Sequence, residues 1–303
     1  MSLTSSRPFG ALLTAMVTPM RADGTVDIEA GARLATHLVD HGHDGLVLNG
    51  TTGEAPTTHA PEKAELIRAV VEAVGDRAVV VAGAGSNDTA HAVRMAEQAA
   101  EVGAHGLLVV TPYYSRPSQE GVYCHTVAVA DATDLPVMLY DVPGRTVVRY
   151  EPATLDRLAA HPRIVAVKDA TGDVQSALRS IDRTGLAWYS GDDGMLLPFL
   201  SVGAVGIVSM AGHLLGDELA SVLRAWDRGE VSLARREFAT LLPTIDLICG
   251  SGNGALRSKL ALALLGLIPG ATMRLPQVPA DEDEVAAVRA ALVTAGHLVS
   301  AEA

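Results

Sequence analysis

A lysine at the end of a short apolar run is the residue in this sequence best placed for covalent chemistry. Residues 164–171 read IVAVKDAT, so a run of apolar residues leads into Lys168 and an acidic turn follows. Burial disfavours the charged form of an amine, and the neutral amine attacks a carbonyl carbon to form a Schiff base. A strand-end lysine can also pair with Asp169 or extend to water, and this segment alone slightly favours that structural role.

Other polar side chains follow the remaining apolar runs. They are hydroxyls, phenols, a guanidinium and flexible glycines, in NGTTGE (49–54), TPYYSRP (111–117), YDVPGRT (140–146), SGDD (190–193) and IVSM (207–210). The sequence pairs no histidine base with a nucleophilic serine and predicts no metal site. An amine beside phenols and hydroxyls suits carbonyl chemistry through an imine, with a phenol as proton shuttle, and suits hydrolysis poorly.

These side chains require a scaffold that brings several strand ends together. Eight apolar, β-branched runs alternate with amphipathic segments such as 61–75, and the runs are 11–17, 45–48, 78–82, 106–110, 136–140, 164–168, 186–190 and 205–209. Their nearly continuous hydrophobicity is typical of strands buried on both faces of a parallel sheet. The alternation predicts an α/β fold, a (β/α)8 TIM barrel, with a doubly wound open sheet as the alternative.

After Met210 the strand pattern ends and helical patterns take over. We expect helices over 214–226, 231–248, 255–267 and 283–298, with no low-complexity linker before them. The predicted organisation is a catalytic barrel over residues 1–212 and a C-terminal helical subdomain over residues 213–303 that packs on it.

Composition restricts the partners and the compartment. The chain has 303 residues and a formal net charge of −12, which argues against binding to nucleic acid or to an anionic membrane. No apolar run approaches the roughly 18 residues of a membrane span, and residues 1–8 lack the apolar core of a signal peptide. Cys124 and Cys249 form no disulfide framework, so we expect a cytoplasmic protein.

Taken together, the motifs resemble the family of pyruvate-dependent class I aldolases and lyases that includes dihydrodipicolinate synthase and N-acetylneuraminate lyase. GTTGE, TPYY, YDVPGRT, VKDATGD and SGDD occur in the family's order and spacing, and the resemblance extends from TAMVTP (14–19) to RLP (274–276). It implies a TIM barrel, no cofactor other than a covalent pyruvate imine on Lys168, and a homotetramer built as a dimer of dimers. The residues themselves leave dimer and tetramer open.

The resemblance also implies catalytic roles. Lys168 matches the lysine that forms the Schiff base with pyruvate, and Tyr140 matches the phenol that relays protons to and from the imine. Thr51 matches the hydroxyl that links Tyr140 to a second phenol, Tyr114, which a neighbouring subunit lends in the family. Structural alternatives remain, because Tyr114 suits an interface and residues 51–53 suit a turn.

The implied substrate-binding residues are Thr52, Arg145, Gly191 and Ile207. Thr52 matches the pocket for the pyruvate carboxylate, Gly191 and the backbone of Ile207 match residues near the same pocket, and Arg145 matches the arginine that binds the carboxylate of the incoming aldehyde. A planar guanidinium binds a carboxylate through two parallel hydrogen bonds. This favours an aldehyde that ends in an α-amino acid group.

The expected reaction condenses pyruvate with L-aspartate 4-semialdehyde to a cyclic precursor of diaminopimelate and lysine. The sialic-acid lyases of the family typically lack the equivalent of Arg145 and have a serine in place of Thr51. The alternatives are a related pyruvate aldolase or dehydratase that acts on a keto-sugar acid, and a non-catalytic barrel that binds a keto acid.

Three departures from the family pattern stand out. Asp141 occupies a position that is usually asparagine, and residues 253–259 (NGALRSK) replace a proline-containing run. In lysine-inhibited members a regulatory pocket carries histidine and glutamate near positions that are Lys63 and His91 here. The loss of the acid and the added positive charge predict weak or absent feedback inhibition by lysine.

Overall fold

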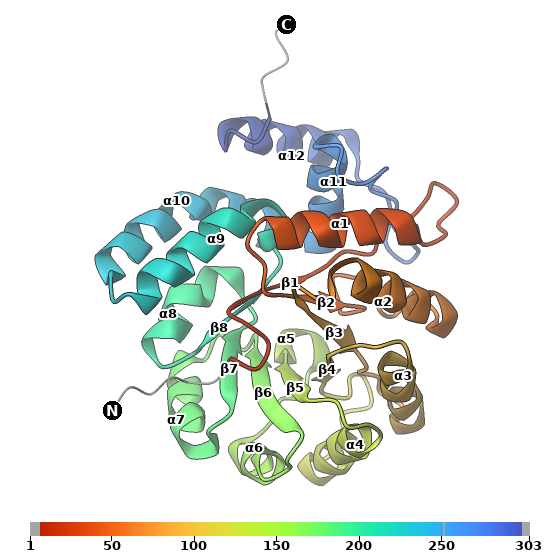
Figure 1. Cartoon of the computed structure of the whole chain (residues 1–303), viewed down its shortest axis with the longest axis vertical. Helices are drawn as coiled ribbons and strands as arrows, with labels where there is room; N and C mark the ends of the chain where they lie inside the picture. The colour runs from red at the N-terminus through yellow and green to blue at the C-terminus, as the bar shows by residue number, and fades with distance from the viewer. Residues whose placement is uncertain (1–6, 251, 299–303) are drawn as a thin grey trace, which may run out of the picture.

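A closed barrel of eight parallel strands forms the centre of the protein (Figure 1). The computed structural model describes residues 7–250 and 252–298. Each strand pairs with the next in the chain, and the ring closes where Leu12 of the first strand lies opposite Ile207 of the last. The strands are β1 (Leu12–Ala15), β2 (Gly45–Leu48), β3 (Val79–Gly83), β4 (Gly106–Val110), β5 (Val137–Asp141), β6 (Ile164–Asp169), β7 (Ala187–Ser190) and β8 (Gly206–Ser209). The predicted TIM barrel is confirmed, and the open-sheet alternative is wrong.

Helices alternate with the strands and surround them (Figure 1). Several begin at residues suited to capping, since the side chains of Asp27, Asp88, Ser118 and Asp173 accept backbone N–H groups of the first turn. The helices are α1 (Ile28–Asp40), α2 (Ala60–Val74), α3 (Thr89–Glu101), α4 (Gln119–Asp131), α5 (Pro143–Thr146), α6 (Pro152–Ala159), α7 (Val174–Thr184), α8 (Leu196–Ser201) and α9 (Gly212–Asp227).

Both faces of the barrel strands are buried, which explains their nearly continuous hydrophobicity. One set of side chains, including Val47, Leu108 and Met138, fills the barrel interior. The alternate residues, such as Leu46 and Leu139, pack against the surrounding helices. The interior is therefore a packed core, and a substrate has access only at its ends.

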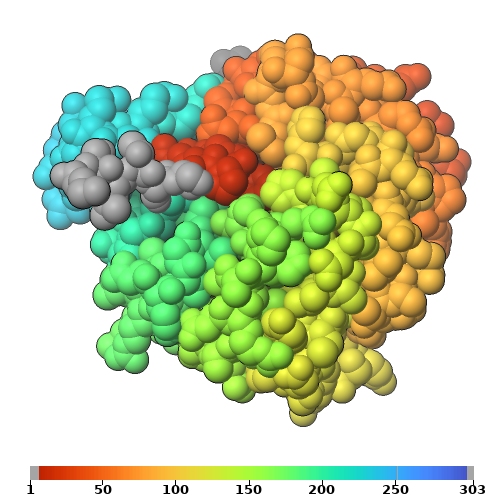
Figure 2. Space-filling view, turned by 60° about the horizontal axis from the view of Figure 1, so that its bottom comes forward, coloured from red at the N-terminus to blue at the C-terminus, as the bar shows by residue number. Residues whose placement is uncertain are grey.

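An aromatic side chain closes the amino end of the barrel. Phe9 is fully buried, and a Cβ atom on Gly106 at the start of β4 would lie only 2.6 Å from its Cε1 atom. In Figure 2 the first described residues, in red, lie between the orange early segments and the green later ones. The amino end is thus sealed, and the site must lie at the opposite end.

The chain ends in further helices that lie to one side of the ring, beside α9 and α1 (Figure 1). They are α10 (Val231–Cys249), α11 (Gly254–Leu264) and α12 (Glu282–Thr294). The predicted helices over these segments are confirmed. The boundary at residue 212 stays a prediction. Residue 1, where the predicted barrel begins, and residue 303, where the predicted subdomain ends, lie outside the described residues.

Two helix ends differ from the prediction. We expected the last two helices to reach residues 267 and 298, but they end at Leu264 and Thr294. In each case a glycine with a left-handed φ follows the helix, Gly266 at 73° and Gly296 at 77°. The N–H of the next residue then bonds back to the last turn, Leu267 to Leu262 O and His297 to Leu292 O, which is the Schellman arrangement.

No helix in the described part of the chain is both long enough and apolar enough to span a membrane.

Candidate active site at the carboxyl end of the barrel

The two residues expected to perform the covalent step lie side by side on neighbouring strands. Tyr140 of β5 pairs in register with Lys168 of β6, so both side chains point to the same face of the sheet. The Nζ atom of Lys168 lies 4.2 Å from the centroid of the Tyr140 ring. Both residues are buried, at 6% and 7% exposure. The amine therefore approaches a phenol within the barrel and away from bulk water.

A cavity of about 850 Å³ opens at this end of the barrel, and four of the predicted site residues line it: Thr51, Tyr114, Tyr140 and Arg145. The side chain of Arg145 makes no hydrogen bond or ion pair with any other described residue, so its guanidinium is available to a ligand. Tyr114 is 89% exposed. These four residues contribute two phenols, a hydroxyl and a guanidinium from segments that are distant in sequence.

The other four predicted residues lie behind or beside this cavity. Lys168 lies against the Tyr140 ring, and Thr52 is buried next to Thr51. Gly191 donates its N–H to Asp169 O at 2.7 Å, and a Cβ at Gly191 would come within 3.0 Å of that oxygen. The side chain of Ile207 packs away from the barrel interior among residues such as Leu215. Only its backbone can therefore border the pyruvate pocket that the sequence predicts.

Backbone strain concentrates around the same cavity. Five non-glycine residues in the described ranges have a left-handed φ: Asn49, Glu54, Tyr114, Arg116 and Val147. All but Glu54 line the cavity, and Glu54 lies in the loop that carries Thr51 and Thr52. Such backbone geometry is unfavourable for side-chain-bearing residues and is often retained at functional sites. The clustering of left-handed residues supports a functional site here. This support comes from backbone geometry and does not depend on which side chains are present.

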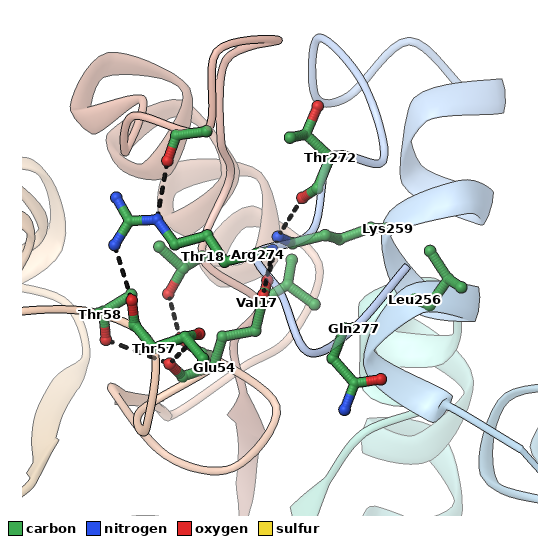
Figure 3. A network of polar contacts seen from close by, with 12 residues as sticks. Val17, Thr18, Glu54, Thr57, Thr58, Leu256, Lys259, Thr272, Arg274 and Gln277 are labelled. Atoms are coloured by element: carbon green, nitrogen blue, oxygen red, sulfur yellow. Dashed lines mark hydrogen bonds and ion pairs between the residues drawn. The ribbon is translucent and has the colours of Figure 1, made fainter. Parts of the chain in front are cut away.

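A buried ion pair holds the loop that carries Thr51 and Thr52 (Figure 3). The carboxylate of Glu54 accepts a hydrogen bond from the ammonium of Lys259 on α11, and both side chains are buried, at 4% and 0% exposure. Lys259 also donates to Thr272 O at 2.7 Å. Sequence reasoning missed this pair, although Glu54 ends the GTTGE motif and Lys259 ends the unusual run 253–259.

Arg274 extends this network on the same side of the loop. Its backbone N–H donates to Glu54 Oε2 at 3.1 Å, and its guanidinium donates to Thr57 O at 2.8 Å. The guanidinium also pairs with Glu62 and holds the pKa of that carboxyl below its ordinary value. The C-terminal region therefore fixes one wall of the cavity.

A second buried acid lies directly beyond Tyr140 and Lys168. Asp141 follows Tyr140 and pairs in register with Asp169, which follows Lys168. Burial, and then the charge of Asp169, raise the pKa of Asp141 to about 7. Its Oδ1 atom has no hydrogen-bond partner, whereas Asp169 accepts from Trp188 Nε1 at 2.9 Å. The sequence marked Asp141 as unusual, but its titration behaviour depends on burial that only the structure reveals.

Within residues 7–250 and 252–298, no three or more His, Cys, Asp or Glu side chains gather in a way that could hold a metal ion.

A closed (β/α)8 barrel with a buried lysine against a tyrosine at its carboxyl end has the architecture of the Schiff-base-forming aldolases and lyases. Comparison with known proteins identifies the family within this class. A sequence model of the dihydrodipicolinate synthetase family matches residues 8–295. The chain belongs to this family.

Curated relatives are similar over nearly their whole length. The chain is 51% identical to the 4-hydroxy-tetrahydrodipicolinate synthase of Bifidobacterium longum, covering 98% of each sequence. It is 54% identical to 4-hydroxy-tetrahydrodipicolinate synthase 2 of Streptomyces coelicolor, covering 97% of each.

Solved structures show the same fold. A dihydrodipicolinate synthase from Cyanidioschyzon merolae with lysine bound superposes with a TM-score of 0.93 at 38% identity, over 97% of this chain and 100% of that one. The enzyme from Bacillus anthracis gives 0.90 at 41% identity, over 94% and 97%. The likeness covers the barrel and the C-terminal helices together.

Proposed function

We propose that this chain is a 4-hydroxy-tetrahydrodipicolinate synthase. It condenses pyruvate with L-aspartate 4-semialdehyde to 4-hydroxy-tetrahydrodipicolinate, on the route to diaminopimelate and lysine. The observation that carries the proposal is the contact between the Lys168 amine and the Tyr140 ring, 4.2 Å apart in a buried strand pair. The names of relatives at 51–54% identity support the same reaction.

Lys168 supplies the covalent step. Its neutral amine attacks the keto carbon of pyruvate, water leaves, and an imine forms. Loss of a methyl proton converts the imine to an enamine, whose carbon attacks the aldehyde carbon of the second substrate. The amino group of that substrate then displaces Lys168 from the former keto carbon, which closes the ring and frees the lysine.

Tyr140 handles the protons of these steps. Its ring contacts Lys168 and its side chain lines the cavity, so its hydroxyl can exchange protons with both the imine and the aldehyde oxygen. Thr51 and Tyr114 line the same cavity and continue the hydroxyl chain toward solvent. No cofactor takes part beyond the pyruvate imine itself.

Arg145 determines the second substrate. Its guanidinium lines the cavity without an internal partner, and it can form two parallel hydrogen bonds to a carboxylate. L-aspartate 4-semialdehyde carries such a carboxylate next to the amino group that closes the ring. The second substrate of a pyruvate aldolase that acts on a keto-sugar acid is a sugar without this α-amino acid carboxylate, so a guanidinium here favours the synthase.

The active assembly is a homotetramer built as a dimer of dimers, in the cytoplasm. The large aromatic side chain of Tyr114 is 89% exposed, which suits a side chain received by a neighbouring subunit. Both cysteines, Cys124 and Cys249, are free thiols, in keeping with a reducing compartment.

Borohydride reduction in the presence of pyruvate tests the proposal. We expect mass spectrometry to locate the reduced pyruvate adduct on Lys168 of the wild type and of the control Lys63→Ala, and to find none in Lys168→Ala. The wild type should then condense L-aspartate 4-semialdehyde in preference to keto-sugar acid substrates. An adduct on another lysine, or turnover by Lys168→Ala at the wild-type rate, would contradict the mechanism. Trapping without condensation would favour a keto-acid-binding barrel.

A further inference from the structure

The residue that ends helix α5 has an unusual backbone conformation. Val147 has φ 66° and ψ −20°, in the left-handed region. The Cβ atom of a side chain makes this region unfavourable, and the penalty is largest for β-branched residues such as valine. Glycine adopts it without penalty. The left-handed backbone at Val147 therefore requires compensation from its surroundings.

Two buried threonines supply the compensation by fixing the chain on both sides of Val147. The hydroxyl of Thr111 lies 2.9 Å from Thr146 Oγ1 and 2.8 Å from Val148 O. Thr146 Oγ1 lies 2.7 Å from Val148 O. Thr111 and Thr146 are almost fully buried, at 0% and 2% exposure. Because both neighbours are anchored, the backbone of Val147 is determined by its surroundings.

The valine side chain itself contributes little packing. Val147 is 58% exposed, so burial of its apolar surface does not account for its presence at a position that suits glycine. It does line the cavity, as Arg145 does two residues earlier.

The left-handed residue also determines where α5 stops. The N–H of Val147 donates to Pro143 O at 2.9 Å and closes the single turn that holds Arg145. The N–H groups of Arg145 and Thr146 both bond to Val142 O, at 2.9 and 3.1 Å. The position of the Arg145 backbone therefore depends on a turn whose last residue is Val147.

We propose that Val147 is a positioning residue for the second substrate: its left-handed backbone fixes the one-turn helix that presents Arg145 to the cavity, and its isopropyl group forms the apolar wall beside that guanidinium. The inference rests on the proposed function and assigns a specificity role to a residue that touches no reacting atom. The ligand group concerned is a carboxylate, whose charged hydrogen bonds to Arg145 strengthen where an apolar neighbour excludes water.

Substitution by glycine separates this role from a merely structural one. Val147→Gly removes the apolar wall beside Arg145, while it relieves the backbone strain at this position. We expect a melting temperature no lower than that of the wild type, a KM for L-aspartate 4-semialdehyde raised roughly tenfold, and an unchanged rate of borohydride trapping with pyruvate. Val147→Ile keeps the branched side chain and should keep the wild-type KM within about twofold.

The control is Val278→Gly, which removes the same side chain from a similarly exposed site, at 61% exposure, without a left-handed φ. It should leave both KM values and the trapping rate unchanged. An aldehyde KM within about twofold of the wild type in Val147→Gly would overturn the inference. A lower melting temperature, or trapping that slows in parallel, would also overturn it. If the wild type fails to condense the semialdehyde, the proposed function fails first and the inference falls with it.

Discussion

The ammonium of Lys259 and the carboxylate of Glu54 form a buried ion pair between helix α11 and the loop that presents Thr51 to the cavity. Both groups have lost their water, so each depends on the other and on the added hydrogen bonds from Arg274 N and to Thr272 O. The pair therefore joins the C-terminal helices to the site.

Removal of one partner should cost more than replacement of both. We expect Lys259→Met to lower the free energy of unfolding by about 3–5 kcal/mol, because it leaves Glu54 charged and unpaired in the interior. The double variant Lys259→Met/Glu54→Gln should recover part of this loss. Urea unfolding measures both. Arg77→Met, at an exposed pair with Asp40, should cost at most about 1 kcal/mol; an equal loss in the two single variants would contradict the argument.

Tyr140→Phe should separate imine formation from proton transfer. The ring that contacts Lys168 remains, so borohydride trapping with pyruvate should persist. The hydroxyl is lost, so kcat should fall by about 10²–10⁴-fold. Steady-state assays and single-turnover trapping measure the two effects. Tyr123→Phe, on α4 beneath Arg157, serves as the control and should keep full activity; normal kcat in Tyr140→Phe would remove the phenol from the mechanism.

Arg145→Ala should weaken binding of the aldehyde alone. Hydrogen bonds to a charged group contribute about 1.5–3 kcal/mol, so we expect the KM for L-aspartate 4-semialdehyde to rise roughly 10–150-fold. The KM for pyruvate should not change. Arg145→Lys keeps the positive charge but loses the planar guanidinium and its paired hydrogen bonds, so its KM for the aldehyde should be intermediate. Arg33→Ala, on the exposed side of α1, is the control, and a parallel rise in both KM values would argue against a specific contact.

Asp141 should make stability depend on pH. Its pKa is raised to about 7 in the folded state by burial and by Asp169, while Arg149 and the Tyr150 backbone act in the opposite direction. The folded protein therefore binds more protons than the unfolded chain from about pH 4 to pH 7, and stability falls as pH rises through this window. The fall is complete above pH 7.

Asp141→Asn removes this titration without changing the shape of the side chain. We expect its melting temperature to decline less than that of the wild type between pH 5 and pH 8. Thermal unfolding at a series of pH values measures the difference. Asp134→Asn, whose side chain is 99% exposed, should follow the wild type. Identical curves for Asp141→Asn and the wild type would show that Asp141 ionises normally.

L-lysine should inhibit this enzyme weakly or not at all. Lys63 and His91 line the cavity, and the Lys63 Nζ atom lies 3.8 Å from Met95 Sδ, where it repels the ammonium of a bound lysine. A titration with millimolar lysine tests this. The dihydrodipicolinate synthase of Cyanidioschyzon merolae, solved with lysine bound, is a positive control for binding. The double variant Lys63→His/His91→Glu should gain sensitivity, and strong inhibition of the wild type would refute the prediction.

The sequence predicted the barrel because two-sided burial leaves a local signature, as in the apolar run of β6. It also predicted that Lys168 and Tyr140 meet, because each ends a strand and the two strands are consecutive. The helix ends after Leu264 and Thr294 were mispredicted, although Gly266 and Gly296 were visible in the sequence. The apolar pattern continues past both glycines, and the prediction followed this pattern instead of treating the glycines as helix ends.

Other features leave no local signature at all. Glu54 and Lys259 are separated by 205 positions, and only the docking of α11 brings them together. The raised pKa of Asp141 depends on its burial beside Asp169. The left-handed φ of Val147 depends on the hydroxyls of Thr111 and Thr146. Each of these is a product of tertiary structure.

The pairing of β1 with β8 has a consequence for synthesis on the ribosome. Leu12 finds its partner Ile207 only after almost two hundred further residues have been added, which takes on the order of 10–40 s at about 5–20 residues per second. During that interval the nascent chain carries an open sheet edge able to recruit strands from other polypeptides. Chaperones that cover this edge should therefore raise the yield of the newly made protein more than they raise the yield from refolding the complete chain.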